Sequence, residues 1–416
     1  MERKRIYLCL AHMSGNEMKY IQEAFDTNWV VPLGPNVNGF EQDLKEFCGV
    51  EGKEVVALSA GTAAVHLALL ACGVGPGDEV LVQSFTFCAS SHPVTYLGAT
   101  PVFVDSEEDT WNMDPQLLEQ AILDRIEKTG KKPKAIVPVY LYGMPAKIEE
   151  IMAVANKYEI PVIEDAAEGL GSRYKGQTCG TFGRYGVLSF NGNKMITTSG
   201  GGALICPDAA AKQEIMYYAT QARESYPYYQ HEHIGYNYRM SNICAGIGRG
   251  QMTVLNEHIQ HHQKVFALYK ELLKEVPGIT LHENPSADYN SNFWLNTILL
   301  DADLKVKGQE HAYEAKIEGA VGGAAGVTHA AKTLRTDCEP NANVEAMRLA
   351  LDAAGIESRP LWKPMHKQPV YAQNPAYVNG VSEALFKRGL CLPSGPCVTE
   401  EEVRYIVDRI KGVLIK

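Results

Sequence analysis

The sequence predicts an α/β protein in which a mostly parallel sheet is covered by helices on both faces. Short runs rich in Val, Ile and Leu alternate with longer helical segments over residues 54–190. Strands buried on both faces give nearly continuous apolar runs, and helical crossovers between such strands make a sheet parallel. The chain has 416 residues, which is more than one typical domain, so we expect two domains.

The expected elements follow the chain as alternating strands and helices. A helical segment within 15–30 and a second helix within 31–50, after a Pro/Gly loop, precede the first strand. The expected strands are Val55–Leu58, Glu79–Gln83, Pro101–Val104, Ala135–Tyr140, Pro161–Glu164 and Val187–Phe190. The helices between them are Thr62–Cys72, Ser90–Leu97, Pro115–Lys128 and Ala146–Tyr158.

Three parts of the chain are expected from this pattern. Residues 1–14 form an N-terminal arm, residues 15–255 a large domain, and residues 256–416 a smaller C-terminal α+β domain. A long charged helix at 250–276 links the two domains, as its periodicity suggests. A Thr-x-x-Glu capping pattern starts a last helix at 399–414. The small-residue stretch 318–345 has no function that we can assign, and we expect a surface insertion there.

Composition excludes several classes of protein. The formal net charge is -10, whereas a nucleic-acid surface needs a basic stripe. No run of 18 apolar residues is present, so we expect no membrane span. The ten cysteines form no C-x-x-C pair, which argues against a metal site and fits a reducing cytoplasm. The apolar part of the N-terminus is too short for a signal peptide.

Lys194 is the first candidate for chemistry. It follows the apolar strand Val187–Phe190 and precedes the run Ser199-Gly200-Gly201-Gly202. A solvated loop lysine is the alternative. However, residues just past a strand end in an open sheet face the crevice where ligands bind. A lysine that loses hydration there becomes a nucleophile toward an aldehyde, and the glycines allow close backbone approach.

A second candidate is the helix start in 59-SAGTAAVHLALLACG-73, directly after the strand Val55–Leu58. Free backbone N–H groups and the helix dipole make such a start an anion site. Capping of the helix by Ser59 or Thr62 is the alternative. The chain contains neither a G-x-G-x-x-G nor a G-x-x-x-x-G-K-[ST] motif, which disfavours dinucleotide and nucleoside-triphosphate sites.

Two further candidates lie at strand ends. In 160-IPVIEDAAEGLGS-172, we expect Glu164 to be a solvated residue that caps the turn, whereas Asp165 points inward and holds a cation such as a pyridinium nitrogen. In 84-SFTFCASSH-92, one of Phe85 and Phe87 packs in the core and the other lies on a ring-shaped cofactor. A phosphate site, an aromatic ring, a carboxylate and a lysine are together what pyridoxal phosphate requires.

In this order of motifs the chain resembles the DegT-type sugar aminotransferases, of pyridoxal-phosphate fold type I, from Trp29 to about Val398. The resemblance implies that Lys194 binds the cofactor aldehyde and moves the proton between the substrate carbon and the cofactor, and that Asp165 pairs with the ring nitrogen. The remaining implied cofactor contacts are Gly61, Thr62, Ala63 and Ser189 at the phosphate, Phe87 on the ring, Glu168 at the ring hydroxyl, and Asn237 from the other subunit of a homodimer.

Two positions depart from the family pattern. Glu168 stands where histidine or glutamine is common, and an ionised glutamate there would repel the ring phenolate. Ser199-Gly200-Gly201-Gly202 replaces a frequent Gly-Glu-Gly-Gly. Trp29 and Pro35 in 29-WVVPLGP-35, together with Arg239 and His366, are the implied contacts to substrate.

The segments 190-FNGNKMITTSGGG-202 and 361-LWKPMHKQPVY-371 are similar to enzymes that aminate UDP-2-acetamido-2,6-dideoxy-4-keto-hexoses, as in UDP-N-acetylbacillosamine synthesis. The implied reaction moves the amino group of L-glutamate to the 4-keto carbon of such a sugar. Amination at the 3-position of a thymidine-linked sugar is an open alternative with the same catalytic residues. Lys194 argues against the 3-dehydratase relatives, which carry histidine at that position. A non-catalytic sensor of the same fold would be expected to have lost the cofactor residues.

Overall fold

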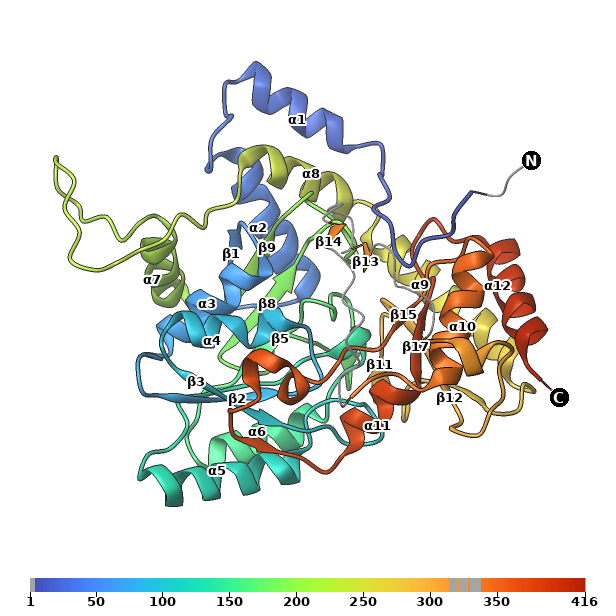
Figure 1. The fold of residues 1–416 in the computed structure, drawn as a ribbon. Coiled ribbons are helices and arrows are strands. Elements are labelled where there is room, and N and C mark those ends of the chain that lie inside the picture. Colours follow the sequence, from blue (N-terminus) through green and yellow to red (C-terminus); the bar gives the residue numbers. More distant parts are fainter. Residues whose placement is uncertain (1–3, 314–319, 322–327, 330–337, 416) are drawn as a thin grey trace.

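A twisted central sheet forms the middle layer of the large domain (Figure 1). The computed structural model describes residues 4–313, 320–321, 328–329 and 338–415. One part of the sheet has the order β1 (Glu54–Leu58), β9 (Gly202–Cys206), β8 (Tyr185–Ser189), β5 (Ile163–Asp165). The other has the order β4 (Ala135–Val137), β2 (Glu79–Gln83), β3 (Thr100–Val104), β16 (Ala376–Tyr377). Parallel bridges next to β4 and β5, Ile136 to Val162 and Val139 to Asp165, join the two parts.

The sheet is mostly parallel, as expected, with β9 as an exception. β9 pairs antiparallel with both β1 and β8, whereas the pairs β5–β8, β2–β3, β2–β4 and β3–β16 are parallel. Side chains alternate between two cores, as the pleat requires: Val55 and Ala57 of β1 belong to one core, and Val56 and Leu58 to the other. Both faces of the sheet are therefore buried.

Helices cover both faces. α2 (Pro35–Cys48), α5 (Pro115–Thr129) and α6 (Ile148–Lys157) contribute to one core, while α3 (Gly61–Ala71), α4 (His92–Tyr96) and α7 (Ala209–Ala219) contribute to the other. α1 (Glu17–Asp26) packs on α8 (Asn242–Met252). Small antiparallel pairings involve β6 (Arg173–Tyr174), β7 (Gln177–Thr178), β11 (Tyr289–Asn290), β13 (Ala320–Val321) and β14 (Thr328–His329).

The C-terminal part has its own antiparallel sheet and a third core. Its strands are β10 (Ile279–Leu281), β12 (Asn296–Leu300), β17 (Gly389–Leu392) and β15 (Arg359–Pro360), and its helices are α9 (Leu255–Leu273), α10 (Ala342–Ala353), α11 (Val381–Arg388) and α12 (Glu400–Val413). The predicted capping box at Thr399 and Glu402 is present. β16 returns to pair with β3, so a C-terminal segment also lies on the large sheet. The predicted domain limits stay a prediction.

Some expected boundaries are wrong. The single helix expected at 250–276 is two helices, because α8 ends at Met252 and α9 begins at Leu255. The strand expected at Ala135–Tyr140 ends at Val137, where Pro138 follows without an N–H to donate. The helix expected at 90–97 is a 3₁₀ turn, Cys88–Ser90, followed by the short α4. Much of the stretch 318–345 lies outside the described residues.

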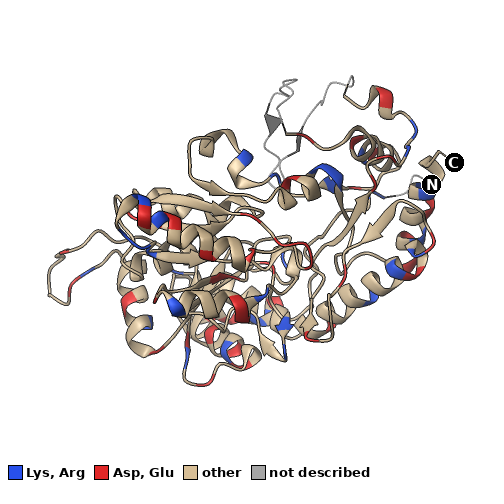
Figure 2. Ribbon diagram, turned by 90° about the horizontal axis from the view of Figure 1, so that it is seen from below, with Lys and Arg blue, Asp and Glu red and all other residues tan. Residues whose placement is uncertain are grey.

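A long segment, residues 220–238, projects from the body of the domain after α7 (Figure 1). It exposes large apolar side chains: Tyr226 is 44% exposed, Tyr228 60%, Tyr229 78% and Ile234 84%. Elsewhere, basic and acidic residues are interspersed along the outer helices (Figure 2). Among the described residues, no helix is both long enough and apolar enough to cross a membrane.

Candidate active site

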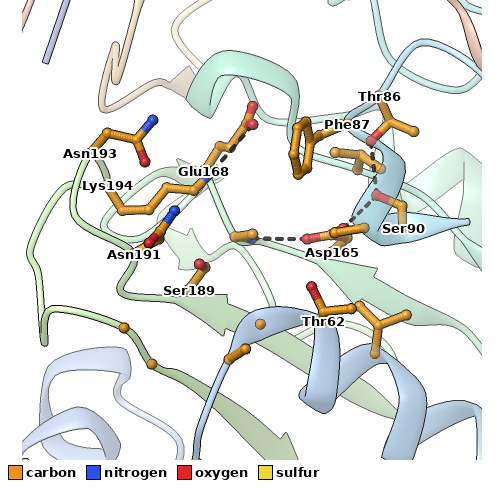
Figure 3. Close-up of a pocket in the computed structure, with 18 of the residues that line it drawn as sticks. Thr62, Thr86, Phe87, Ser90, Asp165, Glu168, Ser189, Asn191, Asn193 and Lys194 are labelled. Carbon is orange, nitrogen blue, oxygen red and sulfur yellow. Dashed lines mark hydrogen bonds and ion pairs between the residues drawn. The ribbon is translucent and has the colours of Figure 1, made fainter. Parts of the chain in front are cut away.

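A cavity of about 310 Å³ lies at the strand ends of the large domain. The residues that form it follow β1, β2, β5 and β8, which is where an open α/β sheet binds its ligands. Seven of the predicted site residues line it: Gly61, Thr62, Phe87, Asp165, Glu168, Ser189 and Lys194. Figure 3 shows that six of them come from separate segments and surround one space: Thr62, Phe87, Asp165, Glu168, Ser189 and Lys194.

The start of α3 forms one wall of this cavity. Its N-cap residue Ala60 makes no side-chain cap hydrogen bond, so the alternative of capping by Ser59 or Thr62 is wrong. The first bond along the helix is donated by the Ala64 N–H to the Ala60 carbonyl, at 3.2 Å. The amides of residues 61–63 therefore have no carbonyl of the helix to donate to, and they suit a phosphate.

Close backbone packing places this helix start against the sheet. A Cβ atom added to Gly61 would lie 3.0 Å from the Ser189 Cβ. One added to Gly202, at the start of β9, would lie 2.5 Å from the Ala60 carbonyl carbon. Gly202 pairs with Leu58 on one side and with Ser189 on the other. Only glycine fits at position 202, because the backbones of β1, β8 and the start of α3 all lie close to it.

Asp165 ends β5 and points into the cavity, as predicted. It is 4% exposed, and its Oδ2 accepts a hydrogen bond of 2.6 Å from the Ser90 hydroxyl. Ser90 in turn contacts Thr86, so the carboxylate is held in one orientation (Figure 3). Burial raises the pKa of Asp165, although the hydrogen bonds and the charge of Lys194 oppose this. A cation bound at this carboxylate would favour its ionised form.

Glu164, the preceding residue, corrects an expectation. It is not a solvated turn cap but is fully buried. It accepts hydrogen bonds from the Tyr140 hydroxyl and from the backbone N–H groups of Gly180, at 2.9 Å, and Gly183, at 2.5 Å. Adjacent residues of a strand face opposite sides, so only one of the two carboxylates can face the cavity, and the other ties β5 to the loop before β8.

Lys194 lies in the loop between β8 and β9, and its side chain is only 13% exposed. Its Nζ is 3.4 Å from Glu168 Oε1 and 4.2 Å from the centre of the Trp294 ring. The other carboxylate oxygen of Glu168 accepts the Tyr142 N–H at 2.7 Å. Burial raises the pKa of Glu168, and the charge of Lys194 opposes that rise. The amine therefore points into the cavity beside a carboxylate (Figure 3).

Phe85 and Phe87 lie in different surroundings, as expected. Phe85 is fully buried in the core, whereas Phe87 is 51% exposed and lines the cavity. The Phe87 ring packs 5.6 Å from the ring of Trp362, which also lines the cavity. One side of the space is therefore aromatic, and it suits a flat ligand ring.

Known proteins resemble this chain over almost its whole length. The model of the DegT/DnrJ/EryC1/StrS aminotransferase family matches residues 11–324 and 324–411. The chain belongs to this family. EpsN of Bacillus subtilis (strain 168) is 45% identical over 409 residues, which are 97% of this chain and 95% of EpsN. The GDP-perosamine synthase of Caulobacter vibrioides is 34% identical over 413 residues, with 99% of each chain covered.

A solved structure confirms the fold. The DegT/DnrJ/EryC1/StrS aminotransferase of Brucella abortus superposes with a TM-score of 0.81 at 29% identity, over 96% of this chain and 95% of that one. The predicted α/β architecture of pyridoxal-phosphate fold type I is thus confirmed, as is the prediction of an aminotransferase. A particular closeness to enzymes of UDP-N-acetylbacillosamine synthesis is not shown, since the relatives include GDP-perosamine synthases.

Pyridoxal phosphate is the cofactor of this aminotransferase family, and the residues present fit it. The free amides at the start of α3 and the Ser189 hydroxyl suit its phosphate. The buried Asp165 carboxylate suits a protonated ring nitrogen, and Lys194 suits the aldehyde. The roles of the individual residues stay predictions that their geometry supports.

Other predicted site residues do not line the cavity of this one chain. Ala63 is buried within α3. Asn237 is exposed in the projecting segment. Trp29 is exposed between α1 and α2, and Pro35 is exposed as the first residue of α2. The Arg239 guanidinium lies 3.6 Å from Glu41 Oε1, and its contact with substrate stays a prediction.

His366 is also outside the cavity lining, with its Nδ1 2.6 Å from the Ser84 hydroxyl. Burial lowers the pKa of His366. Conversely, several residues that line the cavity were not predicted as site residues from the sequence: Ser59, Thr86, Ser90, Asn191, Asn193, Trp294 and Trp362. Those at positions 86, 90, 191 and 193 lie within or beside the motifs that were recognised, whereas no local signal marks Trp294.

Proposed function

We propose that the protein transfers the amino group of L-glutamate to the 4-keto carbon of a UDP-linked 2-acetamido-2,6-dideoxy-4-keto-hexose. The observation that carries the aminotransferase chemistry is one cavity in which the Lys194 amine, the buried Asp165 carboxylate and the free start of α3 meet. The choice of sugar rests on the resemblance of residues 190–202 and 361–371 to enzymes that aminate such sugars. Relatives that make GDP-linked amino sugars supply the competing choice.

Each group has a defined task in this reaction. When bound, pyridoxal phosphate supplies the electron sink that accepts the electron pair left when a C–H bond of the amino donor breaks. The Lys194 Nζ takes the proton from Cα of the donor, and in the second half-reaction it delivers a proton to the sugar carbon. Asp165 holds the ring nitrogen protonated, and the start of α3 fixes the phosphate end, so that the reacting atoms stay aligned.

Visible absorption tests both halves of the reaction. The purified protein is charged with pyridoxal phosphate and L-glutamate, freed of excess, and mixed with UDP-2-acetamido-2,6-dideoxy-4-keto-glucose. We expect glutamate to bleach the band of the lysine-bound cofactor and the sugar to restore it. Lys194→Ala should abolish transfer while far-UV circular dichroism stays unchanged, and undiminished turnover in this variant would refute the mechanism.

Parallel reactions with other sugars separate the substrate choices. A GDP-linked 4-keto-6-deoxy-hexose and a thymidine-linked 3-keto sugar are each added to the amine-loaded protein. Faster recovery of the band with either one would replace the UDP-sugar proposal and leave the aminotransferase chemistry intact. If glutamate fails to bleach the band, other amino donors replace it in the first half.

A homodimer with shared sites is the second part of this proposal. Asn237 is exposed, while its neighbours Tyr236 and Tyr238 stack on each other, and the Tyr238 hydroxyl lies 3.2 Å from His66 Nδ1 in α3. Because Tyr236 and Tyr238 are held by these contacts, Asn237 between them faces outward. The exposed tyrosines of the same segment suit an apolar contact with a second copy of the chain.

Mixing two inactive variants tests the shared site. Lys194→Ala and Asn237→Ala proteins are denatured together and refolded, so that mixed dimers form. If Asn237 acts in the partner's site, each mixed dimer has one intact site, and activity returns to about a quarter of the wild-type value in an equal mixture. Mixtures no more active than the separate variants would place Asn237 in its own subunit's site or outside any site.

A further inference from the structure

The amine of Lys194 lies between two walls, and only one of them belongs to the predicted site. Glu168 Oε1 forms the first, at 3.4 Å from Nζ. The face of the Trp294 indole forms the second, with its centre 4.2 Å from Nζ. This distance is well within the limit of about 6 Å for a cation–π contact, and the contact is strongest with tryptophan and away from water. Trp294 is 2% exposed, so water does not compete for its ring.

The indole is held in place from both ends. Its Nε1–H donates to the carbonyl of Asn193, the residue before the lysine, at 2.7 Å. The Trp294 backbone N–H donates to Asn292 Oδ1 at 2.8 Å, and the Asn292 amide donates to the Glu168 carbonyl at 2.9 Å. Asn292 therefore connects the backbone of Glu168 with that of Trp294. The indole itself is hydrogen-bonded to the loop that carries Lys194.

We propose that Trp294 is a positioning residue that binds the Lys194 ammonium while the lysine is not bonded to the cofactor. The proposal rests on the aminotransferase reaction, in which that lysine is released when the cofactor takes up the amino group. A released ammonium in a largely apolar cavity has lost its water, and Glu168 and the ring face replace it. A lysine bonded to the cofactor presents no free ammonium. The ring contact therefore stabilises the amine-loaded enzyme more than the aldehyde-loaded enzyme.

An equilibrium measurement tests this preference. The holoenzyme is equilibrated with mixtures of L-glutamate and 2-oxoglutarate. Absorbance gives the ratio of L-glutamate to 2-oxoglutarate at which half of the cofactor is in the amine form. This ratio depends on the relative stability of the two enzyme forms and not on rates. For Trp294→Leu we expect the ratio of L-glutamate to 2-oxoglutarate at this midpoint to rise about 2- to 30-fold, the range spanned by cation–π contacts. Trp294→Phe keeps a ring face and should give a smaller rise.

Trp111→Leu is the matched control, because it removes another buried indole that does not line the cavity. The Trp111 ring stacks on His282, with 3.6 Å between the ring centres, and not on Lys194, so the ratio in Trp111→Leu should stay at the wild-type value. An unchanged ratio in Trp294→Leu, or an equal rise in both variants, would overturn the proposal. A wild-type protein that glutamate does not convert would instead refute glutamate as the donor.

A second measurement needs neither donor nor cofactor. The cofactor-free protein is treated with trinitrobenzenesulfonate, which modifies unprotonated amines, and the modification of Lys194 is followed by peptide mass analysis. Loss of the ring face should speed this modification several-fold in Trp294→Leu. Trp362→Leu removes another indole from the lining of the cavity, so it shows how much of any increase is due to a more open cavity. Equal rates in the wild type and Trp294→Leu would refute the contact.

Discussion

Gly202→Ala should weaken cofactor binding through the phosphate end alone. The added methyl group would lie 2.5 Å from the Ala60 carbonyl carbon and 2.7 Å from its oxygen, both backbone atoms. Ordinary contact requires the start of α3 to move by about 1 Å. A shift of that size breaks the alignment of at least one amide with the phosphate. A hydrogen bond to a charged group contributes about 1.5–3 kcal/mol, so the Kd should rise roughly 10- to 150-fold.

The assay compares pyridoxamine phosphate with pyridoxamine, since neither can react with Lys194. Each is titrated into the cofactor-free protein, and quenching of tryptophan fluorescence gives the Kd. Gly202→Ala should lose affinity for the phosphorylated ligand alone. Gly200→Ala is the matched control, because a Cβ atom there meets nothing within 4 Å, although Gly200 also lines the cavity. An unchanged Kd in a folded Gly202→Ala protein would refute the argument that α3 is held by this contact.

Substitutions of the neighbouring carboxylates Asp165 and Glu164 should change the stability of the protein in opposite directions. Burial raises the pKa of Asp165, so its charge costs stability increasingly as pH rises above its ordinary value of 3.8. Cofactor-free Asp165→Asn should therefore be more stable than the wild type in urea, by a margin that is small near pH 4, grows as pH rises and levels off above the raised pKa. Transfer should fall roughly 10²-fold. Glu164→Gln removes an acceptor from a buried group with three donors and should cost about 1–3 kcal/mol of unfolding free energy. Its cofactor affinity should stay unchanged; the reverse pattern in either variant would show that the two roles are misassigned.

Local patterns carry much of the fold. The apolar runs that become β1, β2, β3 and β8 are short, bounded by turn residues and separated by helices, which is why their positions could be predicted. β9 was missed because 202-GALIC-206 follows a glycine run directly and has no helix before it. A parallel strand needs a crossover, whereas β9 is antiparallel to β8 and needs only a loop.

Site residues that follow strand ends could likewise be predicted from the sequence, whereas Trp294 could not. Asp165, Phe87 and the start of α3 each follow a strand end, and the sheet brings strand ends together. Trp294 lies 100 positions after Lys194 and reaches it only through the packing of another part of the chain. Its orientation depends on Asn292, which accepts the Trp294 N–H and donates to the backbone carbonyls of Glu168 and Leu170, far away in sequence. Contacts of this kind leave no period or spacing in the sequence, so only the structure could reveal them.

The position of one lysine between an apolar strand and a glycine run now has a physical reason. The loop from β8 to β9 must leave the sheet at Ser189, present Lys194 to the cavity and return at Gly202, which pairs with Ser189 across the two strands. The same loop thus carries the amine and ends beneath the start of α3. The two ends of a bound cofactor, its phosphate and its aldehyde, would therefore be positioned by one short segment. A change at Gly202 that moves this segment as well as α3 would disturb the alignment of Lys194, so transfer should fall further than the loss of cofactor affinity alone predicts.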